Sequence, residues 1–388
     1  MPMFKLIQAS LFGTEFQDRI SEETYLEMKQ QGIAILPAGI ISSICMSDDL
    51  QKKWKHDIIE AISFGELYQY MQSRIPITVP YVILKGTSAA QYYPHPEYRA
   101  LGDIDLITRR EDYLIACEML AQNGWVESPS RHQSLEEGRH RSFERNNILI
   151  EIHSYFSIFT DVERSEYLDN LILENIQSTH VLPDLINGLV LLAHIDQHFE
   201  QGIGLRHIVD WMMFVNKCLP DEKWKEFSAH AKIIGLDKLA ITVTRMCEIY
   251  LGLHEREWTR GTDTIICKQL MDYIMSSGDF GRKQALEEKI GQNVLSFVRK
   301  PKSFLKLMQE QGLKHWKTAR RNPILRPFAW LYQANRYLLR GVGRSDAKSK
   351  LMSEYKAFKE RKALCDALGT TQASNGIVIY KDGKYVKK

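Results

Sequence analysis

Three carboxylates lie in short stretches with the alternating pattern of β-strands. Asp103 and Asp105 are two positions apart in the run GDIDL at 102–106, and Glu151 lies in ILIEIH at 148–153. Successive side chains of a strand point to opposite faces, so Asp103 and Asp105 share one face, and a neighbouring strand can bring Glu151 to them. Carboxylate oxygens suit Mg²⁺ or Mn²⁺, which activate a hydroxyl and stabilise a leaving oxygen in phosphoryl transfer. We predict all three as metal ligands and catalytic residues, with Glu151 as third ligand or general base. The alternatives are a solvated strand end for the aspartates and a surface strand for Glu151.

A glycine turn supplies a candidate site for phosphate groups. The apolar, β-rich run at 79–84 predicts a buried strand that ends at Gly86, and a short helix opens directly after it. Backbone N–H groups at such a turn can hold phosphate oxygens. The predicted nucleotide-binding residues are Lys85, Gly86, Thr87, Ser88 and Arg99. For Lys85 the alternative is a surface salt bridge, and for Arg99 an ion pair within its loop.

These motifs together resemble those of a known superfamily. A glycine turn, an Asp-x-Asp pair and a later strand carboxylate resemble the signature of polymerase-β-like nucleotidyltransferases. More narrowly, LKGTSAAQYYPHPEYRALGDIDLI at 84–107 resembles a bacterial family of uncharacterised nucleotidyltransferases, and the likeness covers about residues 50–300. The usual Gly-Ser is Gly86-Thr87 here, and the 17 positions between Gly86 and Asp103 fit the narrower family.

The resemblance implies an enzyme that uses a nucleoside triphosphate (NTP). It would transfer a nucleoside monophosphate (NMP) to a hydroxyl or phosphate acceptor, which the sequence does not identify among small molecules, sugars, peptides and proteins. Positioning and charge neutralisation would carry this catalysis. Two alternatives stay open: kinase-type transfer of the γ-phosphoryl group on the same scaffold, and a non-catalytic module that binds nucleotide or a partner.

The same resemblance points to a histidine-containing helix and an Arg-x-x-x-Asp element further along the chain. His194 and His198 share one helix face, but Ile195 follows His194, so the zinc-protease pattern is missing and polar packing against the active-site cleft is the favoured interpretation. Arg206 and Asp210 either contact nucleotide or acceptor or pair with each other. The predicted acceptor or nucleotide contacts are His153, His194, His198, Arg206 and Asp210.

The elements that must position these residues follow from the hydrophobic pattern. Apolar residues recur at helical spacing until Pro76, strand-like runs occupy the next part, and the pattern is helical again from about residue 163. Asn146-Asn147 between two apolar runs predicts a hairpin turn. We predict an α+β fold with a small mixed-sheet nucleotidyltransferase core, a helical N-terminal lobe and a large helical C-terminal lobe. The predicted domains are 1–75, helical; 76–160, the α/β core; 161–345, helical; and 346–388, a charged helix and tail with a small hairpin.

The charge is distributed unevenly along the 388 residues. The net charge is +3, yet residues 299–344 contain twelve Lys and Arg against one acidic residue, Glu310, with aromatic residues interleaved. This segment is predicted to contact an anionic acceptor or nucleic acid, to rest on an anionic membrane surface, or to pair with the acidic remainder. A hydrophobic content of 44% excludes a wholly disordered chain. Six single cysteines, no convincing signal peptide and no apolar run long enough for a membrane span predict a cytoplasmic protein.

Overall fold

The computed structural model describes residues 1–128, 140–156, 159, 161–176, 179–199 and 202–279. It also describes the shorter stretches 308–309, 312–313, 315–333, 335, 362–370, 378–381 and 384–387. The chain divides into two compact units, one formed by residues 1–284 with 375–388 and the other by 285–374.

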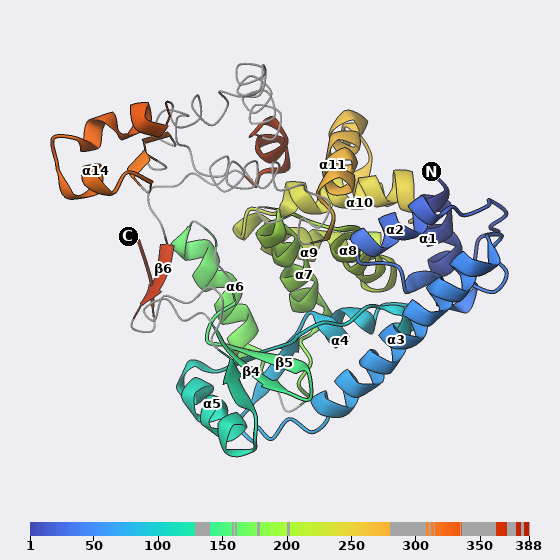
Figure 1. Cartoon of the computed structure of the whole chain (residues 1–388), viewed down its shortest axis with the longest axis horizontal. Coiled ribbons are helices and arrows are strands. Elements are labelled where there is room, and N and C mark those ends of the chain that lie inside the picture. The colour runs from blue at the N-terminus through green and yellow to red at the C-terminus, as the bar shows by residue number, and fades with distance from the viewer. Residues whose placement is uncertain are drawn as a thin grey trace. The chain divides into compact units, whose positions relative to one another are not determined.

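The first unit contains a five-stranded mixed sheet, which lies beside α5 in Figure 1. Its strand order is β1-β2-β5-β4-β3, with β2 and β5 parallel and the other neighbours antiparallel. The strands are β1 (Tyr81–Leu84), β2 (Ile104–Thr108), β3 (Val126–Ser128), β4 (His140–Arg145) and β5 (Ile148–His153). The predicted α+β class and mixed sheet are confirmed, although β3 was not anticipated.

The hairpin between β4 and β5 turns at the predicted asparagines. Asn146 and Asn147 have φ values of 52° and 62°, as a two-residue turn that follows the strand twist requires. Arg145 therefore pairs with Ile148, and the register continues to His140 opposite His153.

One face of the sheet is apolar and fully covered. Ile104, Leu106, Ile150 and Ile152 are completely buried and share a hydrophobic cluster with residues of α5 (Tyr113–Gln122). A shift of β2 or β5 by one residue would move these isoleucines to the other face, so their burial fixes the register. The acidic positions between them are thereby held on the opposite face.

Helices make up most of the first unit. On the N-terminal side these are α1 (Pro2–Phe12), α2 (Glu22–Gln30) and α3 (Asp48–Gln72), and the last of them ends before Pro76 as predicted. The turn after β1 leads into the short α4 (Gly86–Ala90). After the sheet come α6 (Val162–Glu174), α7 (Asp184–His198), α8 (Leu205–Cys218), α9 (Asp221–Ile233), α10 (Asp237–Leu251) and α11 (Thr264–Ser277). The strands β6 (Val378–Lys381) and β7 (Lys384–Lys387) form the predicted C-terminal hairpin.

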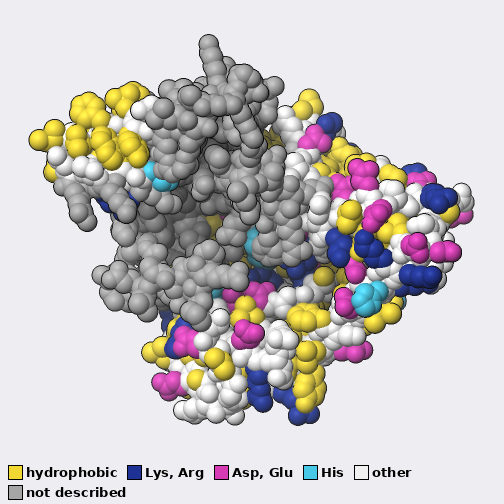
Figure 2. All heavy atoms as spheres, viewed as in Figure 1, with side chains coloured by type: hydrophobic (Ala, Val, Ile, Leu, Met, Phe, Trp, Pro, Cys, Tyr) yellow, Lys and Arg dark blue, Asp and Glu magenta, His cyan; other side chains and the backbone are white. Residues whose placement is uncertain are grey.

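The second unit contains the whole basic segment, residues 299–344. Its described part includes α14 (Lys317–Arg321) and the 3-10 turn η6 (Arg326–Phe328). Ile324 and Phe328 are 76% and 51% exposed there, and Figure 2 shows hydrophobic side chains gathered on the surface of this segment. Of the charged helix predicted within 346–388, residues 362–368 are described, as helix. No helix in the described part of the chain combines the length and the apolar character needed to cross a bilayer.

Candidate functional site

The three predicted carboxylates meet on one face of the sheet, at the neighbouring central strands β2 and β5. The parallel pairing of β2 and β5 sets Asp105 directly beside Glu151, and Asp103 lies just before β2 begins. One carboxylate oxygen from each residue lies within 4.8 Å of the others. Three oxygen donors at this spacing fit a divalent cation of the Mg²⁺ or Mn²⁺ type, because a hard cation prefers carboxylate oxygen and offsets their mutual repulsion.

Asp105 is the most enclosed member of this group. It is 3% exposed, and its Oδ1 lies 2.8 Å from Lys85 Nζ and 2.9 Å from His153 Nε2. Burial raises the pKa of Asp105, but the charges and hydrogen bonds of Lys85 and His153 outweigh burial, and the pKa stays below its ordinary value. Lys85 thus points into the acidic site.

Asp103 has the opposite electrostatic character. The charge of Asp105, followed by partial desolvation, raises the pKa of the Asp103 carboxyl above its ordinary value. Two neighbouring carboxylates therefore have their pKa values pushed apart, which is typical of functional sites.

Two histidines face the carboxylates from the hairpin. His153 Nε2 lies 3.7 Å from Glu151 Oε2, and His140 Nε2 lies 3.5 Å from Glu151 Oε1. His153 was a predicted contact residue, but sequence reasoning missed His140. The Asn146-Asn147 turn was the available signal, since counting back from it sets His140 opposite His153.

The glycine turn after β1 fits closely against α3. Gly86 has a φ of 41°, and a Cβ placed on it would lie 2.7 Å from the hydroxyl oxygen of Tyr68. That hydroxyl is buried and donates to the backbone oxygen of Asp103 at 3.2 Å. Lys85, with a φ of 54°, shares the left-handed region that favours glycine. The turn therefore lets Tyr68 hold the backbone of a predicted metal ligand.

The hydroxyl groups of the turn are used within the protein. Ser88 Oγ donates to the backbone oxygen of Ile83 at 2.7 Å, and Thr87 Oγ1 donates to Gln72 Oε1 at 2.9 Å. Phosphate binding by this turn would therefore use backbone N–H groups, as expected from the sequence.

Arg99 forms a buried ion pair with Asp210 on α8. Its Nε and Nη2 lie 3.0 and 2.7 Å from the two carboxylate oxygens, and the hydroxyl of Tyr93 donates to the same carboxylate at 2.7 Å. Arg206 pairs instead with Asp279, and its Nη2 lies 3.3 Å from Asp279 Oδ2. The alternative that Arg206 and Asp210 pair with each other is therefore wrong. Arg99 fastens the loop before the acidic pair to the helical part of the unit.

The predicted histidines of α7 are joined by a third from α8. Donor atoms of His194, His198 and His207 lie within 4.8 Å of one another. Burial, followed by the charge of His198, lowers the pKa of His194 and of His207 well below the ordinary value. These two imidazoles are therefore neutral at pH 7.

The middle of the chain matches one known protein family. Residues 76–252 match the family described as uncharacterised nucleotidyltransferase. No curated protein and no solved structure matches the chain. The nucleotidyltransferase match runs from just before β1 to the end of α10 and so includes the sheet and the helices that carry the histidines and Asp210. It supports the family resemblance over this range.

Proposed function

We propose that this chain is a metal-dependent nucleotidyltransferase that transfers an NMP group from an NTP to a hydroxyl or phosphate acceptor. The observation that carries the proposal is the convergence of Asp103, Asp105 and Glu151, whose oxygens lie within 4.8 Å of one another inside the stretch that matches the family. Mg²⁺ is the proposed metal, and Mn²⁺ has the same ligand preference.

Different groups of the chain would bind the metal and the triphosphate. Asp103, Asp105 and Glu151 would hold the metal, which when bound neutralises phosphate charge and stabilises the leaving oxygen. Backbone N–H groups of the turn at 86–88 would bind phosphate oxygens. The Lys85 ammonium, which already faces Asp105 at 2.8 Å, would lie against the triphosphate as a point charge.

Arg99 would act as a positioning residue. Because its guanidinium is held bidentately by Asp210, it orients the loop that leads to Asp103. Such preorganisation matters in phosphoryl transfer, where placing the reactants supplies much of the rate enhancement.

Isotope labelling tests which phosphoryl group moves. The full chain would be incubated with Mg²⁺, ATP labelled at either the α or the γ position, and a small-molecule and protein extract of the source cells. We expect the α label to enter a product with release of pyrophosphate, and Asp105→Asn to abolish the transfer. Asp272→Asn, which changes an exposed aspartate on α11, is the matched control and should transfer normally.

The other outcomes separate the alternatives. Transfer of the γ label alone would establish a kinase and overturn the proposal. If no label moves and Mg²⁺ with NTP raises the melting temperature of wild type and Asp105→Asn equally, the chain binds nucleotide without using the acidic site, and the proposal fails.

A further inference from the structure

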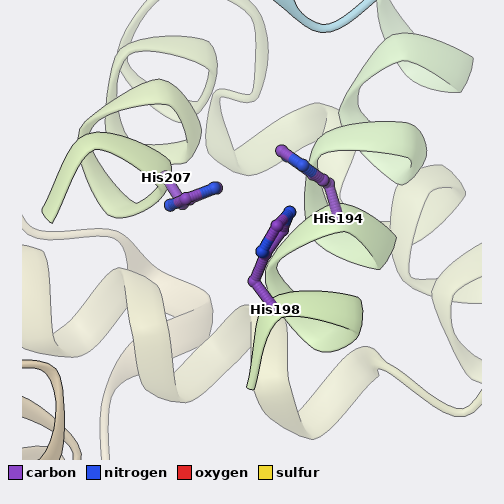
Figure 3. Close-up of side chains that lie close together, drawn as sticks. All are labelled: His194, His198 and His207. Atoms are coloured by element: carbon purple, nitrogen blue, oxygen red, sulfur yellow. The ribbon is translucent and has the colours of Figure 1, made fainter. Parts of the chain in front are cut away.

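Three histidines from two helices converge at a point distinct from the carboxylates. His194 and His198 lie one turn apart on α7, and His207 is the third residue of α8. Their ring centroids are 4.4 to 4.8 Å apart, and Figure 3 shows the three rings turned toward one another. Donor atoms from all three lie within 4.8 Å of one another, so the rings could close around one metal ion.

The chemistry of these donors differs from that of the acidic site. Imidazole nitrogen is a borderline ligand that suits Zn²⁺ and similar ions, whereas Mg²⁺ prefers oxygen. His194 and His207 are 8% and 2% exposed, so bulk water solvates them little.

A buried carboxylate lies behind one of the three rings. Asp279 Oδ1 lies 3.6 Å from His207 Nδ1, and Arg206 Nη2 lies 3.3 Å from the other carboxylate oxygen. Asp279 is itself tightly enclosed, because a Cβ on Gly204 or on Gly32 would lie 2.7 Å from its atoms. Histidine ligands usually donate one ring N–H to a carboxylate, which directs the other nitrogen to the metal, and Asp279 would take this role once its oxygen closes on His207 from 3.6 Å.

We propose that His194, His198 and His207 bind one Zn²⁺ ion, in a site separate from the carboxylates and oriented through Asp279. Three protein nitrogens fill three of the four positions that zinc prefers, which is the ligand count of zinc sites that keep one position for water or substrate. The ion would join α7, which holds the glycine turn through a hydrogen bond from Asn187 to the backbone of Ser88, to α8, which holds the loop before Asp103 through the pair of Asp210 with Arg99. The proposal does not depend on the nucleotidyltransferase activity.

Metal analysis of the purified full chain tests the site. The protein would be produced without a polyhistidine tag, supplied with equimolar Zn²⁺, freed of loose metal by gel filtration and measured by plasma mass spectrometry. We expect about one zinc per chain in the wild type and at least about a tenfold loss of zinc affinity in His198→Ala and His207→Ala. Asp103→Asn changes only the acidic site, and His56→Ala removes an exposed histidine of α3, so both controls should keep the zinc.

Spectroscopy of the wild type keeps the test independent of how the variants fold. X-ray absorption of the zinc-loaded chain should show nitrogen neighbours at about 2.0–2.1 Å with the scattering pattern of imidazole rings. Wild type that takes up no zinc, zinc that is retained fully in folded His198→Ala and His207→Ala, or a zinc shell without imidazole would each overturn the proposal.

Discussion

Lys85 Nζ lies 2.8 Å from Asp105 Oδ1, so the ammonium group of the residue before Gly86 forms an ion pair with the buried carboxylate of the acidic site. The pair is largely enclosed, with the two side chains 16% and 4% exposed, and solvent therefore screens it little. Lys85 and a divalent cation compete for the same charge. In the proposed function, Lys85 would neutralise Asp105 before metal and triphosphate bind.

Replacing Lys85 with methionine should therefore strengthen the binding of metal alone. Without the competing ammonium, we expect Mn²⁺ affinity to rise about fivefold, equivalent to roughly 1 kcal/mol. Binding of NTP in the presence of metal should weaken, because a cation that faces the triphosphate is lost. Calorimetric titration with Mn²⁺ and then with NTP measures both. Lys268→Met, which removes an exposed ion pair of α11, is the control, and equal Mn²⁺ affinity in wild type and Lys85→Met would show that the pair does not compete with metal.

Asp103→Asn and Asp105→Asn should change the stability of the metal-free protein in opposite directions. The folded pKa of Asp105 is lowered, so its ionised form stabilises the fold above the unfolded value of about 3.9, and this is lost as the pH falls through the folded pKa. Asp105→Asn should therefore cost about 1–3 kcal/mol at pH 7. The folded pKa of Asp103 is raised, so its ionised form opposes folding at pH 7. Asp103→Asn should be stabilising, by less than about 1 kcal/mol because that side chain is exposed.

Urea unfolding without divalent metal measures both differences. Each difference in the free energy of unfolding should shrink as the pH falls from about 5 toward 3, because the carboxylates then become protonated in the folded state, the unfolded state or both. Both variants should nevertheless lose the stabilisation that Mg²⁺ gives the wild type. Effects of the same sign at pH 7 would contradict this electrostatic account.

The carboxylates could be predicted from the sequence because their placement follows local rules. Side chains alternate between the two faces of β5, and because Ile150 and Ile152 are apolar and buried, Glu151 must lie on the opposite face. The Asn146-Asn147 turn sets the register of the hairpin. Asp103 lies just before β2 begins, yet its carboxylate lies beside those of Asp105 and Glu151, as the alternation of side chains predicts.

Other contacts could not be predicted because they depend on how distant elements pack. Asp279 lies 72 positions after His207, and no local pattern joins them. Arg99 is 111 positions from Asp210, and the two meet only because α8 lies beside the loop that leads to Asp103. The third histidine was visible in the sequence, but only the crossing of α7 and α8 shows that it joins the other two.

Gly86→Ala should damage both stability and activity. The added Cβ would meet the Tyr68 hydroxyl at 2.7 Å and would adopt a left-handed φ of 41°, for which we expect a cost of about 2–3 kcal/mol. Combining it with Tyr68→Phe should recover part of that cost, because the clashing oxygen is gone, and a double-mutant cycle measures the recovery. Gly65→Ala, in the middle of α3 with open space around it, should stabilise by about 0.5–1 kcal/mol. Strictly additive costs in the cycle would disprove the close approach.

Arg99→Leu and Asp210→Leu should each destabilise the fold by about 3–5 kcal/mol, because each leaves one buried charge without its partner. The double variant should cost clearly less than the sum of the two, since neither charge remains. Chemical denaturation of the four proteins gives the coupling energy. Arg99→Lys should rescue little, because an ammonium cannot reproduce the two parallel bonds to the carboxylate. Stability unchanged in Arg99→Leu, with only a raised KM for NTP, would instead establish Arg99 as a phosphate ligand.

The hairpin turn allows a test of how strongly the fold fixes the catalytic register. Asn147→Ala should cost about 1 kcal/mol, because alanine tolerates a φ of 62° less well than asparagine, whereas Asn147→Gly should be neutral or stabilise by a few tenths of a kcal/mol. Asn123→Ala, at the end of α5 with a φ of −101°, is the control and should not show this backbone cost.

Activity below the melting temperature should be unchanged in all three, because buried Ile150 and Ile152 hold Glu151 on its face whichever residue makes the turn. Thermal melting and the α-label assay measure the two effects. A large loss of activity in a folded Asn147→Gly variant would mean that the turn, and not the apolar face of β5, sets the position of Glu151.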